Sequence, residues 1–498
     1  MLIQTNPARI RETSATYIAD ESSDPTLQEI LVALSFALDL TEGAVPGHAI
    51  RSCLLAVRLA QAVGLDETTV SDLYYASLLK DVGCSSNSAR MCQIVGGDDR
   101  VVKAGAKLAD WTQPLKPELS TLKMLWQQVL PGASLVRKGA RIVKLAATQH
   151  ENNRELIELR CDRGATIVRK LGLPLEAAVA VRHLDEHWDG GGYPQGLKGT
   201  AIPILSRLMA VSQHLDAFCM ERGPQAAIDT LVDRSGRWFD PTLAAAAVAL
   251  DKSRKLFHHC LPDDRVADTR EAILRLGPQE QTLLSAVDID AICETFADVV
   301  DAKSPFTYRH SVGVMDAAVA IGNAMGLPAE RMQLLRRAAL LHDVGKLSIS
   351  NTILDKPTRL DDNELKIIKG HPGLGADILR HIGPFREIAI MAREHHEKLD
   401  GSGYPANLAA KDLSLESRLL AVADIYGALS ETRPYREALP PAQIIAIMDR
   451  DIPAKLDGAC YEALRSVMDD LTLPAHGSEQ PVTDRWASSS FDAVEVYI

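Results

Sequence analysis

Aromatic residues are scarce in this sequence of 498 residues, since Phe, Trp and Tyr together make up only 5% of it. Aromatic and β-branched side chains are the strongest strand formers, so this shortage argues against a β-sandwich, and the plentiful alanine and leucine favour packed helices. The length is sufficient for about two to four domains with cores of their own. The sequence therefore predicts an all-α protein of more than one domain.

Three further absences concern the compartment of the protein. The eight cysteines show no CxxC spacing, so the sequence indicates neither a zinc ribbon nor a disulfide framework. No run of about 18 apolar residues occurs. The polar residues 1–24 also lack the basic-then-apolar layout of a signal peptide. We expect free thiols, no membrane span and a cytoplasmic location.

Positive charge is in short supply as well. The chain has 54 Lys and Arg residues against 66 Asp and Glu residues, which gives a formal net charge of −12. Such a balance argues against a nucleic-acid or membrane-surface partner held by bulk electrostatics. An anionic substrate would need a local positive centre, and bound metal ions would supply one.

The chain contains an internal repeat. The motif KDVG at residues 80–83 aligns with HDVG at residues 342–345 at an offset of 262, and two GYP motifs, at 192–194 and 403–405, align at an offset of 211. The first copy therefore carries an insert of about 262 − 211 = 51 residues between Cys84 and Arg160. This insert is largely helical by pattern, and the sequence assigns it no role.

The repeat defines the expected domain organisation. The predicted segments are a leader (1–25), a first repeat (26–255) with a helical insert at about 85–160, a polar linker (256–284), a second repeat (285–470) and a tail (471–498). His258 and His259 in the linker lack spaced partners, so we expect them to be surface residues and not ligands. The tail is rich in Ser, Pro, Gly and Asp, a composition typical of poorly ordered chain ends.

The motif HDVGK at residues 342–346 closes a helical run in the second repeat. Neighbouring residues on a helix point about 100° apart, so His342 and Asp343 are poorly placed to ligate one ion from one face. Asp343 has two carboxylate oxygens, however, and could bridge two ions while His342 caps one of them. Lys346, one turn further on, would then face a bound anion.

The second repeat holds five more candidate ligands at helix ends and turns: His310, His371, His395, His396 and Asp424. An aspartate after an apolar run is costly to bury without a compensating cation, and two adjacent histidines are hard to explain by packing. Five histidines and two aspartates could enclose two octahedral metals. Mixed nitrogen and oxygen ligation without cysteine suits iron or manganese better than structural zinc.

Taken together, these residues resemble the HD-GYP family of bacterial cyclic dinucleotide phosphodiesterases. The resemblance covers about 285–450 and rests on HDVGK (342–346), His371-Pro372, the motif HHEKLDGSGYP (395–405), Asp424 and RPYR (433–436). It implies an all-helical HD-type fold with a di-metal centre, commonly iron or manganese. The implied reaction is hydrolysis of cyclic di-GMP to the linear dinucleotide or to GMP.

The resemblance also implies a role for each matching residue. The implied metal ligands are His310, His342, Asp343 as the bridge, His371, His395, His396 and Asp424. Asp343 and Lys346 would be the catalytic residues, with Lys346 against the phosphate, and Arg433 and Arg436 would contact the phosphates or bases of the substrate. The loop of Gly403, Tyr404 and Pro405 would dock partners such as diguanylate cyclases of the GGDEF type.

Three positions of the second repeat depart from the family pattern. Phe306 stands where some members carry a glutamate that supports a third metal, so we expect two metals. The loop at 406–410 lacks the usual GLxGxxIP sequence, and Gly427 stands where an aspartate is common. These departures bear on substrate preference and partner docking, and they remove no expected ligand.

The first repeat resembles a degenerate HD-GYP domain. It keeps the GYP turn and, of the ligand set, His48 and Asp81. The other ligand positions hold Lys80, Arg160, Leu184-Asp185 and Gln213. Lys80 and Arg160 would place positive charge where the ions belong, so we expect a regulatory repeat without catalysis.

Three functions follow as alternatives. The main prediction is a metal-dependent phosphodiesterase that hydrolyses cyclic di-GMP to pGpG or GMP. The second is a hydrolase of 3'3'-cyclic GMP-AMP or of another nucleotide, because tandem arrangements with a degenerate first half are similar to some mixed-dinucleotide hydrolases. The third, of another class, is a non-catalytic signalling module that docks diguanylate cyclases. A homodimer is left open.

Overall fold

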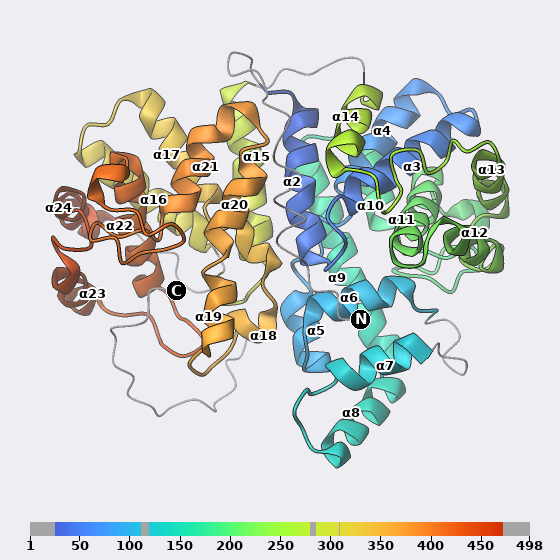
Figure 1. The fold of residues 1–498 in the computed structure, drawn as a ribbon, viewed down its shortest axis with the longest axis horizontal. Coiled ribbons are helices and arrows are strands. Elements are labelled where there is room, and N and C mark those ends of the chain that lie inside the picture. The colour runs from blue at the N-terminus through green and yellow to red at the C-terminus, as the bar shows by residue number, and fades with distance from the viewer. Residues whose placement is uncertain (1–24, 111–118, 279–284, 308, 472–498) are drawn as a thin grey trace. The chain divides into compact units, whose positions relative to one another are not determined.

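The structure, a computed structural model, describes residues 25–110, 119–278, 285–307 and 309–471 (Figure 1). Within these ranges it is helical and contains isolated β-bridges but no strand, which confirms the predicted all-α class. None of the described helices is long and apolar enough to cross a membrane. Apart from Pro25 and Leu471, the predicted leader and tail lie outside the described residues.

The chain divides into two compact units, with the boundary after Ser285 and with Ser350–Thr352 belonging to unit 1. Between Pro25 and Ser285 the helices are α2 (Leu27–Thr41), α3 (His48–Ala62), α4 (Glu67–Leu78), α5 (Ser88–Val95), α6 (Asp99–Leu108), α7 (Leu119–Gln128), α8 (Leu135–Ala147), α9 (Gln149–Lys170), α10 (Leu175–Arg182), η1 (Gly199–Ala201), α11 (Ile204–Arg222), α12 (Pro224–Asp233), α13 (Pro241–Lys252) and α14 (Val266–Leu276). Helix α14 falls in the range predicted as a linker, and it packs against α3 and α2.

After Ser285 the helices are α15 (Ala286–Asp301), α16 (His310–Ala324), α17 (Ala329–Leu341), η2 (Val344–Ser348), α18 (Asn351–Leu354), α19 (Asp362–Ile368), α20 (His371–Leu379), η3 (Gly383–Phe385), α21 (Arg386–Glu394), η4 (Ala410–Asp412), α22 (Leu415–Ser430), α23 (Pro441–Met448), η5 (Asp449–Asp451), α24 (Gly458–Val467) and η6 (Met468–Asp470). Helix α16 packs against α17 and α22. The core of this unit includes fully buried leucines from α17 and α22, namely Leu335, Leu341 and Leu419.

The two units repeat the same helices. Helix α3 begins at His48 and α16 at His310, which keeps the offset of 262, and α11 begins at Ile204 and α22 at Leu415, which keeps the offset of 211. The packing is repeated as well, since α3 packs against α4 and α11 as α16 packs against α17 and α22. The alignment of the repeats in sequence is therefore also an alignment in structure.

A glycine permits the same close approach in each unit. A Cβ atom on Gly345 would overlap the carbonyl oxygen of His371, and a Cβ atom on Gly83 would overlap that of Arg160. Only glycine therefore lets the segment after Asp343 lie against the start of α20. This contact brings Asp343 and His371, which are distant in sequence, to one place.

A remote aspartate holds the first turn of the equivalent helices. Asp39 accepts hydrogen bonds from the backbone N–H groups of Gly47 (2.8 Å) and Ala49 (2.9 Å), and Asp301 accepts from the N–H of Ser311 (3.0 Å) and from its hydroxyl (2.7 Å). Burial raises the pKa of both carboxyl groups to about 7. Each aspartate satisfies orphan donors at a helix start and so fixes the histidine beside it.

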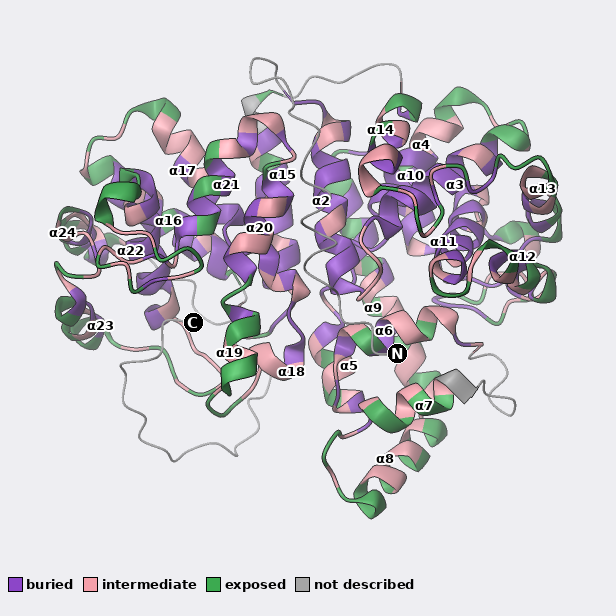
Figure 2. Cartoon of the chain, viewed as in Figure 1, coloured by how far each residue is buried: buried purple, intermediate pink, exposed green. Residues whose placement is uncertain are grey.

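The insert of the first repeat forms helices with a small core of their own. Val95, Val102 and Val129 are its buried residues. Helix α8 has no buried residue, and Figure 2 shows its surface as exposed or intermediate. The predicted helical character of the insert thus holds for its described residues, and its apolar side chains are only partly covered.

Candidate metal centre

Seven side chains converge inside unit 2, and all are the predicted ligands. They come from the start of α16, the end of α17, the start of α20, the end of α21 and the middle of α22: His310, His342, Asp343, His371, His395, His396 and Asp424. Six are buried and His396 is intermediate. Helix ends from four parts of the sequence therefore meet at one point.

Asp343 lies at the centre of the group. Its Oδ1 is 3.2 Å from His371 Nε2 and 3.9 Å from His395 Nε2. Its Oδ2 is 3.5 Å from His310 Nε2 and 3.4 Å from His342 Nε2. The two oxygens thus face two different pairs of histidines, which is the arrangement that a bridging carboxylate needs.

Asp424 completes both sides of the group. Its Oδ1 lies 3.3 Å from His310 Nε2 and 3.6 Å from His342 Nε2, and its Oδ2 lies 3.7 Å from His396 Nδ1. One side of the cluster therefore holds two histidines and a carboxylate oxygen from each aspartate. The other side holds His371, His395 and His396 with the remaining oxygen of Asp343.

Backbone carbonyls fix the tautomer of three rings. The Nδ1 atoms of His342, His371 and His395 each lie 2.7 Å from the carbonyl oxygen three residues earlier, on Ala339, Ile368 and Ala392. A carbonyl only accepts, so each Nδ1 carries the proton and donates it. In the neutral ring each Nε2 then presents a lone pair to the centre, as in metal-bound histidines.

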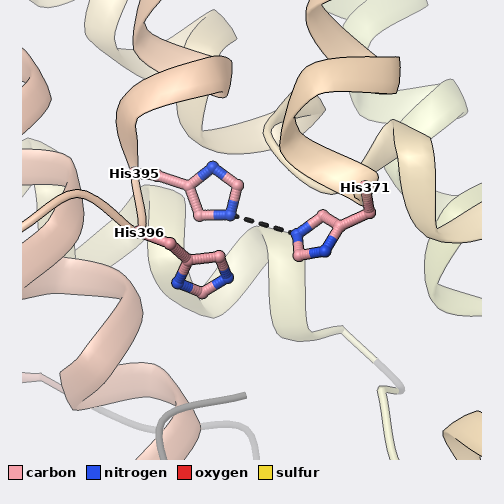
Figure 3. Close-up of side chains that lie close together, drawn as sticks. All are labelled: His371, His395 and His396. Carbon is pink, nitrogen blue, oxygen red and sulfur yellow. Dashed lines mark hydrogen bonds between the residues drawn. The ribbon is translucent and has the colours of Figure 1, made fainter. Parts of the chain in front are cut away.

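This donor set fits a cation. His371 Nε2 and His395 Nε2 lie 3.3 Å apart (Figure 3), although burial lowers the pKa of both rings and keeps them neutral. Two lone pairs at that distance repel unless a positive charge lies between them. Among the described residues, four more buried nitrogen and oxygen atoms here have no hydrogen-bond partner: His310 Nε2, His342 Nε2, Asp343 Oδ1 and His396 Nε2.

The charges of the cluster are those of a ligand set. Burial alone would raise the pKa of Asp343, but His342 and Lys346 hold it well below the usual range. Burial lowers the pKa of His396 to about 3. The Asp343 carboxylate is therefore ionised and the His396 imidazole neutral, which are the forms that coordinate metals. Burial lowers the pKa of His342, but Asp343 and Asp424 outweigh burial and raise that pKa to about 10, so an ion bound there would displace a proton from that ring.

Sequence reasoning missed Glu431. Its carboxylate accepts from His310 Nδ1 at 3.0 Å and pairs with Arg433 at 3.3 Å. Burial lowers the pKa of His310, but the carboxylates of Glu431 and Asp424 outweigh it and raise the pKa to about 9. Glu431 orients His310 so that its Nε2 faces the centre.

Gly427 was the sequence signal that could have pointed to Glu431. An aspartate is common at this position, so its absence indicates that another residue must hold His310. A Cβ atom on Gly427 would lie 3.9 Å from His310 Nδ1. In unit 1 the equivalent residue is Asp216, which accepts from His48 Nδ1 at 2.7 Å. Glu431, about one turn further on, thus takes the place of the missing aspartate.

The predicted substrate residues lie in three different settings. Lys346 Nζ is 2.6 Å from Asp343 Oδ2, at the edge of the centre. Arg433 reaches the cluster through Glu431. The guanidinium group of Arg436 instead donates to the carbonyls of Ala428 (2.7 Å) and Leu429 (2.9 Å) at the end of α22, so these donors are already engaged.

The GYP loop is anchored in the same way in both units. Glu397 accepts from the N–H groups of Ala406 (2.6 Å) and Leu408 (3.0 Å), as Glu186 does from those of Gln195 and Leu197. The Tyr404 ring lies 4.8 Å from that of His396. Gly403 is buried and Pro405 is exposed, and the docking role of this loop stays a prediction.

Unit 1 has ammonium and guanidinium groups at the equivalent place. Lys80 pairs with Asp81, and Arg160 pairs with Asp185. Lys107 Nζ lies 3.4 Å from Asp81 Oδ1, 3.0 Å from Glu42 Oε2 and 3.5 Å from His48 Nε2. Positive charge is thus placed as predicted, and Lys107, which lies in the insert and has no counterpart in unit 2, was missed.

Comparison with known proteins agrees with this geometry. A model of the HD domain family matches residues 107–243 and 294–460. The chain is 35% identical over 464 residues to 3'3'-cGAMP-specific phosphodiesterase 3 of Vibrio cholerae, covering 91% of this chain and 98% of that protein. It is 36% identical to the cyclic di-GMP phosphodiesterase response regulator RpfG of Xanthomonas campestris, over 29% of this chain and 39% of that protein.

A solved structure is similar over most of the chain. The crystal structure of a cyclic GMP-AMP specific phosphodiesterase of V. cholerae, V-cGAP3, superimposes with a TM-score of 0.62 at 32% identity. The match covers 91% of this chain and 99% of that structure. The likeness therefore extends over both repeats and is not limited to the second.

Proposed function

Because the chain belongs to the HD-GYP family and is a cyclic dinucleotide phosphodiesterase, we propose that its substrate is 3'3'-cyclic GMP-AMP. One observation carries this proposal. The relative that matches both repeats is named for that substrate, whereas the similarity to RpfG, named for cyclic di-GMP, covers 29% of this chain. The alternative named above is thus better supported than the main sequence-based prediction of cyclic di-GMP.

The residues of unit 2 would hold two divalent ions. His310, His342, Asp424 and Asp343 Oδ2 form one ligand group, and His371, His395, His396 and Asp343 Oδ1 form the other. The ligands are nitrogen and oxygen without sulfur, which favours iron or manganese. When bound, two such ions acidify a water molecule and polarise phosphate oxygens, the chemistry that diester hydrolysis needs.

The other residues prepare this site for an anion. Lys346 places its Nζ beside Asp343, where its charge would offset charge that develops on the phosphate oxygens. Asp301 fixes the start of α16 and Glu431 the ring of His310, so the ligands are ordered before substrate arrives. Burial of the ligands keeps bulk water from competing for them.

Unit 1 would be regulatory or scaffolding. Its fold is retained, but lysine and arginine side chains balance the carboxylates that would otherwise bind ions. Reverting one ligand position would leave the other cations in place. We therefore assign hydrolysis to unit 2 alone.

The test is turnover of a substrate panel by the purified full chain. We expect kcat/KM for 3'3'-cyclic GMP-AMP to exceed that for cyclic di-GMP and cyclic di-AMP by at least about tenfold. A preference for cyclic di-GMP would restore the first prediction. Metal analysis of the same preparation should find about two ions per chain, and a preparation active without stoichiometric metal would refute the assigned site.

A further inference from the structure

Unit 1 contains a cavity of about 660 Å³ that the proposed hydrolysis does not use. It lies between the insert helices and the residues at the degenerate centre, and its lining runs from α5 and α7 to α11. Sites for small molecules have volumes of about 300–1,000 Å³. The cavity is therefore large enough for a ligand, and it lies where unit 1 differs most from unit 2.

The insert lines the cavity with flexible aliphatic side chains. They are Met91, Ile94, Met124, Leu125, Ile142 and Leu145, all only partly buried. An aliphatic chain inserted among them would gain about fourfold in affinity for each methylene buried. These side chains offer no hydrogen bonds, so a polar body such as a ribose–phosphate ring would leave its own groups unpaired.

The aromatic part of the lining is already engaged. His187 stacks on Trp238 with ring centroids 4.1 Å apart, and the guanidinium of Arg234 lies 4.5 Å from the centroid of the same ring. His214 packs edge-on against Phe239 at 5.1 Å. These contacts disfavour a purine, which binds by stacking on an aromatic face, and they favour an aliphatic ligand.

The lining also includes polar side chains with unused capacity. Asn87 Oδ1 and Gln213 Oε1 are buried acceptors without a hydrogen-bond donor among the described residues. Glu42 Oε1 also lacks a hydrogen bond, but it is paired with Lys103 Nζ at 3.6 Å. Arg160, which also lines the cavity, binds Asp185 through Nε and Nη2, whereas its Nη1 has longer contacts, 3.6 Å to the sulfur of Cys84 and 3.9 Å to Glu42 Oε2. A ligand head that both donates and accepts would satisfy these groups.

We propose that this cavity binds a hydroxylated fatty acid. The carboxylate would accept from Arg160, the hydroxyl would donate to Gln213 Oε1, and the alkyl chain would lie among the aliphatic residues of the insert. The insert, present only in the first repeat, would thus have turned the former metal centre into a receptor site. This proposal does not depend on which cyclic dinucleotide unit 2 hydrolyses.

The experiment is calorimetric titration of the full chain with 3-hydroxymyristate and with myristate. We expect one molar equivalent of 3-hydroxymyristate to bind, and myristate to bind about 3- to 10-fold more weakly, as loss of one hydrogen bond implies. Asp343→Ala should bind both as the wild type does, because the site lies in unit 1. Absence of binding by either acid, or preferential binding of cyclic GMP-AMP in this cavity, would overturn the proposal.

Two variants with matched controls locate the site. Ile142→Trp fills the cavity and should weaken binding at least about tenfold, whereas Val136→Trp, on the same helix but 82% exposed, should not. Gln213→Leu should remove the preference for the hydroxylated acid, and Gln61→Leu, at an exposed position, should keep it. Unchanged affinity in Ile142→Trp would place the ligand elsewhere and refute the assignment even if the wild type binds.

Discussion

Asp81 of unit 1 and Asp343 of unit 2 occupy equivalent buried positions with opposite surroundings. Asp81 lies against Lys80 and Lys107, and Asp343 lies among four imidazoles whose Nε2 atoms converge on it. A buried carboxylate needs a compensating positive charge. Unit 1 supplies that charge from two lysines of its own chain, whereas unit 2 places Lys346 against one oxygen of Asp343 and, in the proposed function, bound ions supply the rest.

The two units share the contacts that hold their folds, although their central side chains differ. Gly83 and Gly345 make the same close approach, and Glu186 and Glu397 anchor the GYP loop by the same two bonds. None of these contacts uses the side chain of a candidate metal ligand. The fold can therefore persist after the ligands are lost, which frees the first repeat for another task.

The largest expected effect comes from removing the shared carboxylate of unit 2. Asp343→Ala deletes one ligand from each side of the cluster, so metal content should fall to near zero and kcat/KM by on the order of 10³-fold or more. Metal analysis and turnover of cyclic GMP-AMP check this, with circular dichroism as the control for folding. A variant with wild-type turnover would show that Asp343 does not bridge.

Lys346 separates charge stabilisation from metal binding. Lys346→Ala removes the ammonium 2.6 Å from Asp343 but no ligand, so metal should be retained while kcat falls about 10²- to 10³-fold. Lys411→Ala, at an exposed position of the same unit, serves as the matched control. If metal is lost along with activity in Lys346→Ala, the lysine acts through the ligands and not on the substrate.

In unit 1 the same logic predicts a loss of stability. Lys107→Met keeps the shape of the side chain but leaves Glu42 and Asp81 without their shared partner, and breaking such buried pairs costs about 3–5 kcal/mol. Denaturant unfolding should show the loss in the transition of unit 1. A stability equal to the wild type would mean that other cations compensate.

The loss of stability at acidic pH should also differ between the wild type and Lys107→Met. Burial alone would raise the pKa of Glu42, but Lys107 and Lys103 lower it to about 2. A depressed carboxyl pKa contributes stability above about pH 4 that is lost as the pH falls towards 2. Stability measured from pH 5 to pH 2 should therefore fall less steeply in Lys107→Met, and an unchanged slope would contradict the pairing.

A smaller effect is expected from the substitute for the missing aspartate. Glu431→Gln keeps a hydrogen bond to His310 but removes the charge, and partners of this kind are worth about 10- to 100-fold in metal affinity. Gly427→Asp, with Val314→Ala to clear the 2.9 Å contact at the new Cβ, should restore part of that affinity by recreating the pairing of Asp216 with His48. Failure of this rescue would show that Glu431 has another role.

Sequence reasoning reached the residues whose pattern is local or repeated. The central position of Asp343 was predicted because this carboxylate directly follows a histidine. The equivalent helix starts at His48 and His310 were predicted from the alignment of the repeats. Lys107 was out of reach because an insert has no second copy with which to compare it. Gly427 signalled that a partner of His310 was missing, but it did not identify Glu431, which lies 121 residues from His310 and meets it only through folding.

The smallest expected effect is that of metal on unit 1, whose stability and activity should not depend on it. A fragment of residues 25–278, which includes α14 because that helix packs on α3 and α2, should fold as a helical protein. It should contain no stoichiometric iron or manganese, hydrolyse no cyclic dinucleotide and keep its Tm when a chelator is added, because Lys80 and Lys107 already neutralise Asp81. The full chain is the matched control, since chelation should lower the stability of unit 2 as ligand linkage requires.

Metal-dependent stability in the fragment would contradict the division between the two units. It would mean that Glu42, Asp81 and Cys84, which lie close enough to share an ion, still bind one.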